Sequence, residues 1–142
     1  MTLAFWDSSA LLKLLVEEQG TNLAAALWDE STGAVASRLI VPEVSAALAE
    51  ALRAGRIDGA RAQVARREWR RYLAALDVVE LTAQIADRAA ILAAAHPLSG
   101  ADAVQLATAV VLEGSDFVVV TWDRRLAAAA SAEGLNVVPA AA

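Results

Sequence analysis

Short apolar runs alternate with longer segments of helical spacing along this chain. Runs rich in β-branched and aromatic residues occupy 3–6, about 34–37, 78–81, 117–121 and 136–138. Between these runs, apolar residues recur at intervals of three and four, as Leu12, Leu15 and Val16 do. Strands separated by helices predict a parallel α/β sheet. The almost continuous apolar character of the runs is typical of parallel strands covered on both faces.

Glycines and capping residues predict where the helices begin and end. Gly20 is expected to end the first helix and Thr21 to cap the next. Pro42 suits the first turn of a third helix, which runs to about Ala54. Further helices are expected over about 58–75, 82–96, 100–112 and 124–134.

The composition narrows the class of protein. The 142 residues suit one domain, 1–142, and an apolar content of 58% excludes a disordered chain. No cysteine is present, which excludes disulfides, thiolate nucleophiles and cysteine-ligated metal centres. There is no signal peptide pattern, and no apolar run approaches the roughly 18 residues of a membrane span, so a cytoplasmic protein is expected. With a net charge of −5, any polyanion must bind through a local basic patch or through cations.

Four acidic residues stand where predicted strands end or predicted helices begin: Asp7, Glu43, Asp102 and Asp123. Taken singly, each is better explained as a helix cap or a first-turn acid. Taken together, they belong to four elements whose ends share the carboxyl edge of a parallel sheet, where ligands bind. Asp77 and Asp116 begin strands and belong to the opposite edge. Glu80 lies near a strand end, so whether it joins the four acids stays open.

Four adjacent carboxylates repel one another unless cations compensate their charge. Mg²⁺ and Mn²⁺ prefer oxygen ligands, and Mg²⁺ needs only one or two carboxylates beside water and substrate phosphate. Such a site hydrolyses phosphodiesters without a side-chain nucleophile, which suits a chain with no cysteine and one histidine.

Four segments carry a resemblance to a known family: "FWDSSALLKLL", "PEVSAALAEAL", "SGADAVQLATAV" and "VTWDRRLAAAASAEGLNVV". In this order they resemble the signature segments of PIN domains, and more narrowly those of VapC-type toxins of bacterial toxin–antitoxin pairs. The resemblance covers residues 3–138. It implies a single-domain, three-layer α/β/α sandwich with a central, mostly parallel sheet of about five strands.

The resemblance also implies a function and a set of site residues. The family's acidic quartet falls on Asp7, Glu43, Asp102 and Asp123. Thr121 matches a hydroxyl that often lies two positions before the last acid, and Ser8 a small polar residue after the first. The implied activity is that of a Mg²⁺- or Mn²⁺-dependent endoribonuclease. Such toxins usually form homodimers and are neutralised by a small VapB-like antitoxin.

Basic residues gather in one segment of this acidic chain. Seven arginines lie within 53–71, among them Arg66 and Arg70. A solvated helix face and a surface for RNA or antitoxin explain them equally well. Arg124 and Arg125 follow Asp123 in a first helical turn, where cations oppose the helix dipole, and this slightly favours a phosphate or carboxylate partner.

Two alternatives to a nuclease remain open. One is a phosphohydrolase or receiver-type domain in which Asp7 is modified, but position 9 is serine where such sites want a second aspartate. The other is a non-catalytic binding module with the same fold. Trp6 and Trp122 are expected to be core neighbours rather than platforms for substrate bases.

Overall fold

Five parallel strands form the centre of the molecule. The computed structural model describes residues 2–112, 114 and 116–139. The strands are β1 (Leu3–Trp6), β2 (Gly33–Ser37), β3 (Asp77–Val79), β4 (Phe117–Val120) and β5 (Asn136–Val138). They lie in the order β3-β2-β1-β4-β5, and all four described pairings are parallel. The prediction of a mostly parallel sheet of about five strands is confirmed.

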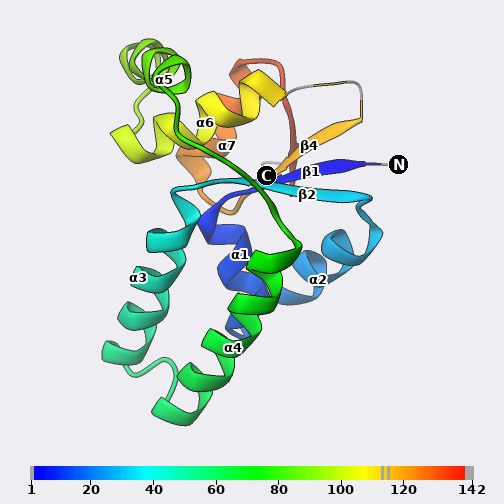
Figure 1. Ribbon diagram of the computed structural model, residues 1–142, viewed down its shortest axis with the longest axis vertical. Coiled ribbons are helices and arrows are strands. Elements are labelled where there is room, and N and C mark those ends of the chain that lie inside the picture. Colours follow the sequence, from blue (N-terminus) through cyan, green and yellow to red (C-terminus); the bar gives the residue numbers. More distant parts are fainter. Residues whose placement is uncertain (1, 113, 115, 140–142) are drawn as a thin grey trace.

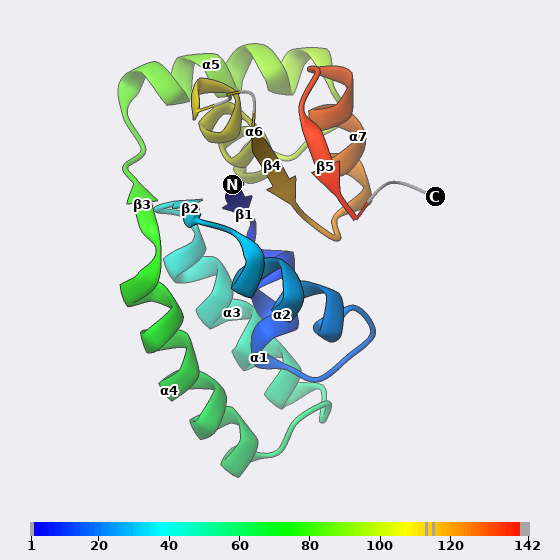
Figure 2. The same ribbon diagram turned by 90° about the vertical axis from the view of Figure 1, so that its right-hand side faces the viewer.

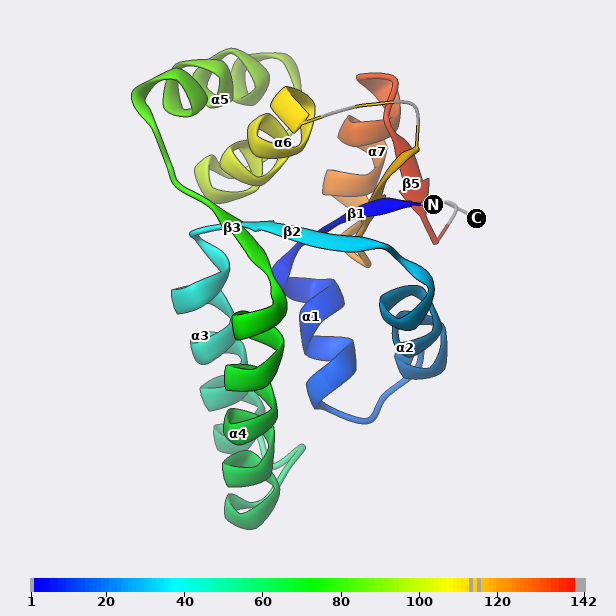
Figure 3. The same ribbon diagram turned by 45° about the vertical axis from the view of Figure 1, so that its right-hand side comes forward.

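Helices cover both faces of the sheet (Figures 1 and 2). On one face lie α1 (Ser8–Leu15), α2 (Thr21–Glu30), α3 (Ile40–Arg53) and α4 (Gly59–Ala75). On the other lie α5 (Ala83–Ala95), α6 (Gly100–Leu112) and α7 (Arg124–Ala132). Figure 3 shows that α3 and α4 run side by side and extend well below the sheet. Within the described ranges, no helix combines the length and apolar character needed to span a bilayer.

Side-chain alternation along β1 builds the two cores. Ala4 and Trp6 pack into the cluster of α1–α4, while Phe5 packs into that of α5–α7. All three side chains are buried, because β1 is the middle strand and helices cover both of its faces. Asp7, the residue after β1, therefore lies at the centre of the carboxyl edge of the sheet.

Three predictions about where helices and strands begin or end are wrong. The first helix ends at Leu15 rather than at Gly20, which instead has a positive φ of 99° and precedes α2 as its N-cap. Thr21 does not cap α2: its hydroxyl accepts a hydrogen bond from the backbone N–H of Glu18, in the turn before the helix. The predicted strand 78–81 is shifted, because β3 ends at Val79 and leaves Glu80 beyond the sheet.

Candidate active site at the carboxyl edge of the sheet

Asp7 is the buried member of the four predicted acids. It caps α1, is only 3% exposed, and uses both carboxylate oxygens. Its Oδ1 accepts hydrogen bonds from the Ser9 hydroxyl at 2.7 Å and the Ala10 backbone N–H at 2.9 Å. Its Oδ2 accepts one from the Thr121 hydroxyl at 2.5 Å. Burial raises the pKa of Asp7 to about 6, although these hydrogen bonds act in the opposite direction.

Asp123 caps α7 and is partly exposed. Its Oδ1 accepts hydrogen bonds from the backbone N–H groups of Arg125 and Leu126, at 2.9 and 3.0 Å. The negative charge of Asp123 contributes to the raised pKa of Asp7. Asp123 is therefore a helix cap, as its position alone predicts, and it also lies close enough to Asp7 to affect its pKa, as the group of acids predicts.

Glu43 and Asp102 approach from the two helical layers. Glu43 lies in the first turn of α3, and its Oε1 accepts a hydrogen bond of 2.6 Å from Gln105 Nε2 of α6. Burial and then the charge of Asp102 raise the pKa of Glu43, despite the Gln105 hydrogen bond. Asp102 lies in the first turn of α6, and burial and then the charge of Asp123 raise its pKa.

These mutual effects show that the four acids lie near one another. The charge of Asp123 contributes to the raised pKa values of Asp7 and Asp102, and the charge of Asp102 contributes to that of Glu43. The structure thus brings together the four carboxylates that the sequence predicts at this edge. Among the described residues, however, no three acidic or histidine side chains are arranged to hold a metal ion by themselves. The donor set fits an ion such as Mg²⁺, which keeps several water ligands and needs few carboxylates.

The neighbours of Asp7 match the prediction only in part. Thr121 contacts Asp7 as expected, and its Oγ1 also accepts a hydrogen bond from the Asp123 backbone N–H at 3.0 Å. The second hydroxyl belongs to Ser9 instead of Ser8. Ser9 Oγ donates to Asp7 and accepts from the Trp122 backbone N–H at 3.0 Å, so it joins the start of α1 to the segment that follows β4. Any catalytic part for Thr121 or Ser8 stays a prediction.

Gln105, like Ser9, contacts one of the four acids and was not predicted from the sequence. It is 1% exposed in an otherwise apolar stretch of α6 and lies three residues after Asp102, on the same side of the helix. A buried amide at this spacing was the available signal. Its Oε1 has no hydrogen-bond partner among the described residues.

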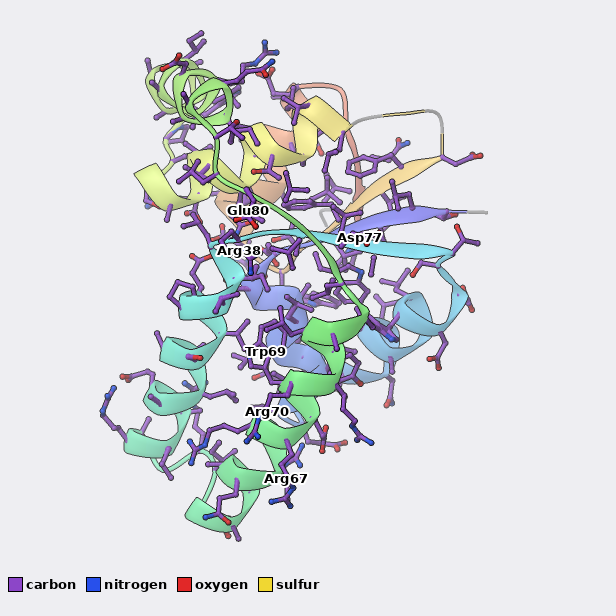
Figure 4. The ribbon with its side chains drawn as sticks, viewed as in Figure 1. Arg38, Arg67, Trp69, Arg70, Asp77 and Glu80 are labelled. Atoms are coloured by element: carbon purple, nitrogen blue, oxygen red, sulfur yellow. The ribbon has the colours of Figure 1, made fainter. Side chains whose placement is uncertain are left out.

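The basic residues divide into two groups. Arg124 and Arg125 are exposed in the first turn of α7, and the positive charge of Arg125 offsets a small part of the rise in the pKa of Asp102. Arg66 and Arg70 are exposed on α4. Figure 4 shows Arg67 and Arg70 along the part of α4 that extends away from the sheet, so Arg70 does not join the carboxylates.

The structure also places Glu80 and two tryptophans. Glu80 makes a forked ion pair with Arg38, with 3.0 Å between Arg38 Nε and Glu80 Oε1, instead of joining the quartet. Trp6 is fully buried, and Trp122 packs partly buried against the same core, as expected. The Lys13 ammonium group lies 5.7 Å from the centre of the Trp122 ring.

Comparisons with known proteins agree with this architecture. The family model of the PIN domain matches residues 4–132. Ribonuclease VapC45 and Ribonuclease VapC49, both from Mycobacterium tuberculosis, are each 47% identical over 99% of this chain and 97% of the relative. The crystal structure of FitAcB from Neisseria gonorrhoeae superimposes with a TM-score of 0.71 at 17% identity, covering 94% of this chain and 95% of that one. This chain therefore belongs to the PIN domain family.

Proposed function

We propose that this protein is a divalent-metal-dependent endoribonuclease, the toxin of a toxin–antitoxin pair. The observation that carries the proposal is the group of four carboxylates at the carboxyl edge, where the pKa values of Asp7, Glu43 and Asp102 are all raised. Burial is the largest cause in each case, and the charge of a neighbouring acid adds to it, so the ionised carboxylates would be stabilised by a bound cation. The 47% identity to two relatives named as ribonucleases supports RNA as the substrate.

Each acid has a distinct place in the proposed reaction. Asp7, Asp102 and Asp123 would share the metal ion with water and with substrate oxygens, because the charge of Asp123 acts on both of the other aspartates. Glu43 is held by Gln105 from the opposite layer, which suits it to orient a water molecule or a second ion. A bound Mg²⁺ or Mn²⁺ supplies an activated water and stabilises charge on the leaving oxygen. Thr121 and Ser9 fix the orientation of the Asp7 carboxylate.

The partners follow from the same resemblance. We propose a homodimer that acts in the cytoplasm and is inhibited by a VapB-like antitoxin covering the carboxylate edge. The raised pKa values of the acids suit this arrangement, because a cationic antitoxin side chain would compensate the same charge that a metal ion does. Arg66, Arg70, Arg124 and Arg125 are kept as proposed contacts to RNA or antitoxin.

The test is cleavage of a mixed RNA substrate by protein freed of any partner, in Mg²⁺, Mn²⁺ or EDTA. Asp7→Asn and Asp102→Asn should abolish cleavage. Asp77→Asn is the matched control, since it makes the same chemical change at the opposite edge of the sheet (Figure 4) and should leave cleavage unchanged.

Four outcomes bear on the proposal. Metal-dependent cleavage that survives only in wild type and Asp77→Asn supports it. Equal cleavage by all variants would identify a contaminating nuclease and remove the support. Mn²⁺ binding by wild type without cleavage of any RNA would favour another metal-dependent phosphohydrolase, and the absence of both would favour a binding module.

A further inference from the structure

Arg38 and Glu80 leave the sheet side by side at its carboxyl edge. Ser37 and Val79 are register partners at the ends of β2 and β3, so the next residue of each strand stands beside the other. Arg38 Nε lies 3.0 Å from Glu80 Oε1, and Arg38 Nη2 lies 2.5 Å from Oε2. Figure 4 shows the two side chains together above the start of α3, at the other end of β3 from Asp77. The guanidinium group is therefore held in one orientation by both carboxylate oxygens.

Stability does not explain this fork. The side chains are 49% and 64% exposed, and ion pairs with such exposure contribute little to folding. The strand ends are already joined by a backbone hydrogen bond of 2.9 Å, from Arg38 N–H to Val79 C=O. What the fork fixes is the direction of a charged group that faces water.

The oriented guanidinium group of Arg38 has N–H donors that the ion pair does not use. Arginine carries five N–H donors, and the fork uses Nε and Nη2. Among the described residues, the Nη1 group of Arg38 has no hydrogen-bond partner. A planar guanidinium with open donors and a fixed plane suits a phosphate oxygen better than a mobile lysine would.

The position of Arg38 relates it to the carboxylate group. In the sheet order β3-β2-β1-β4, Arg38 follows β2, Asp7 follows β1, and Arg124 and Arg125 begin the helix after β4. Adjacent strands lie about 4.8 Å apart, so arginines flank Asp7 on both sides within a few strand spacings. An RNA strand crossing the strand ends would meet a cation before and after the acids, which would otherwise repel it.

We propose that Arg38 is a positioning residue that binds an RNA phosphate on the β2 side of the cleaved bond, and that Glu80 holds its guanidinium in place. This inference rests on the proposed function and adds one substrate contact to it.

The test compares two charge-neutral double variants. Arg38→Ala with Glu80→Ala removes the fork, and Asp87→Ala with Arg88→Ala removes an exposed acid and base from α5. Both keep the net charge of wild type, so a difference reports a located contact rather than overall attraction. The readouts are kcat and KM for an RNA oligonucleotide, its Kd in EDTA at several salt concentrations, and the thermal midpoint.

Removing the fork should raise KM and Kd about tenfold and leave kcat within about twofold, because one charge-assisted phosphate contact is lost. The slope of log affinity against log salt should fall by about 0.7, the value for one phosphate on a single strand. The α5 variant should match wild type. Arg38→Lys should keep most of the salt slope but recover only part of the affinity, since an ammonium group cannot form the fork.

Equal KM and Kd in the two double variants would overturn the inference. A thermal midpoint that falls together with affinity would assign the pair a structural role and overturn it as well. If wild type cuts no RNA, the proposed function fails, and the EDTA titration alone decides whether Arg38 binds RNA phosphate.

Discussion

The chain contains two junctions in which a strand ends at an aspartate that caps the next helix, β1–α1 and β4–α7. The carboxylate of Asp7 is buried and accepts hydrogen bonds from two hydroxyl groups and one backbone N–H. That of Asp123 is partly exposed and accepts two backbone N–H groups on a single oxygen. Asp7 Oδ2 faces Thr121 at the end of the neighbouring strand, whereas both hydrogen bonds to the Asp123 carboxylate come from its own helix.

This difference shows that capping a helix and being removed from water are separate properties of an acid. In both junctions the cap fixes where the carboxylate lies, but only in the first does the surrounding fold remove it from water. Burial is what raises the pKa of Asp7 to about 6. The two aspartates therefore should respond differently to pH and to substitution.

The largest expected effect is on stability as a function of pH without metal. The raised pKa means that the folded protein holds the Asp7 proton more tightly than the unfolded chain does. In EDTA, the free energy of unfolding should thus fall by about 3 kcal/mol as pH rises from 4 to 7, above which the loss is complete. Asp7→Asn should remove most of this dependence and be the more stable protein at pH 7. Urea unfolding at several pH values measures it.

Asp77→Asn is the control, because it removes an exposed carboxyl at the other edge and should keep the full pH dependence. A wild-type stability that rises between pH 4 and 7 would contradict the burial argument. Adding Mn²⁺ at pH 7 should raise the stability of wild type more than that of Asp7→Asn, since a ligand stabilises the state that binds it.

The next effect concerns the hydroxyl that joins the two junctions. Thr121→Val should cost about 1–3 kcal/mol, because Asp7 Oδ2 loses its hydrogen bond in a buried place. It should also move the pH transition of stability upward, since that hydrogen bond lowers the pKa of Asp7. Thr108→Val is matched in burial, but its hydroxyl bonds only to the Val104 carbonyl. If both valine variants leave the pH transition in place, Thr121 does not support Asp7.

Much of this comparison was predictable from the sequence, because strand ends and caps are local. The run before Asp7 and the run before Asp123 predict strands, and a parallel sheet brings their ends to one edge. What was not predictable depends on side-chain direction across the sheet. Nothing local distinguishes Ser8 from Ser9, yet only Ser9 Oγ reaches both Asp7 and the Trp122 backbone. Gln105 likewise meets Glu43 only because α3 and α6 converge from opposite faces.

A substitution at Gly20, in the loop before α2, should disturb the second junction with a smaller loss of stability. Gly20 has a positive φ, and a Cβ there would lie 2.9 Å from Nε1 of Trp122, next to Asp123. Gly20→Ala should destabilise the fold by about 2 kcal/mol, from backbone strain of about 1 kcal/mol and displacement of the indole. Gly55→Ala has the same sign of φ with open space around the Cβ, so it should show the strain alone. Thermal unfolding compares the two variants. Equal losses of stability would mean that the Trp122 side chain moves aside without a cost in free energy.

The smallest expected effect separates the cap from the charge at Asp123. Asp123→Ala should cost about 1 kcal/mol through the lost cap, as Asp58→Ala should at the exposed N-cap of α4. Asp123→Asn keeps a capping oxygen and should cost only a few tenths of that, while it removes a negative charge that raises the pKa of both Asp7 and Asp102. Stability would then be nearly unchanged while metal-dependent RNA cleavage falls sharply. Cleavage at the wild-type rate by Asp123→Asn would leave Asp123 a helix cap and confine the site to the other three acids.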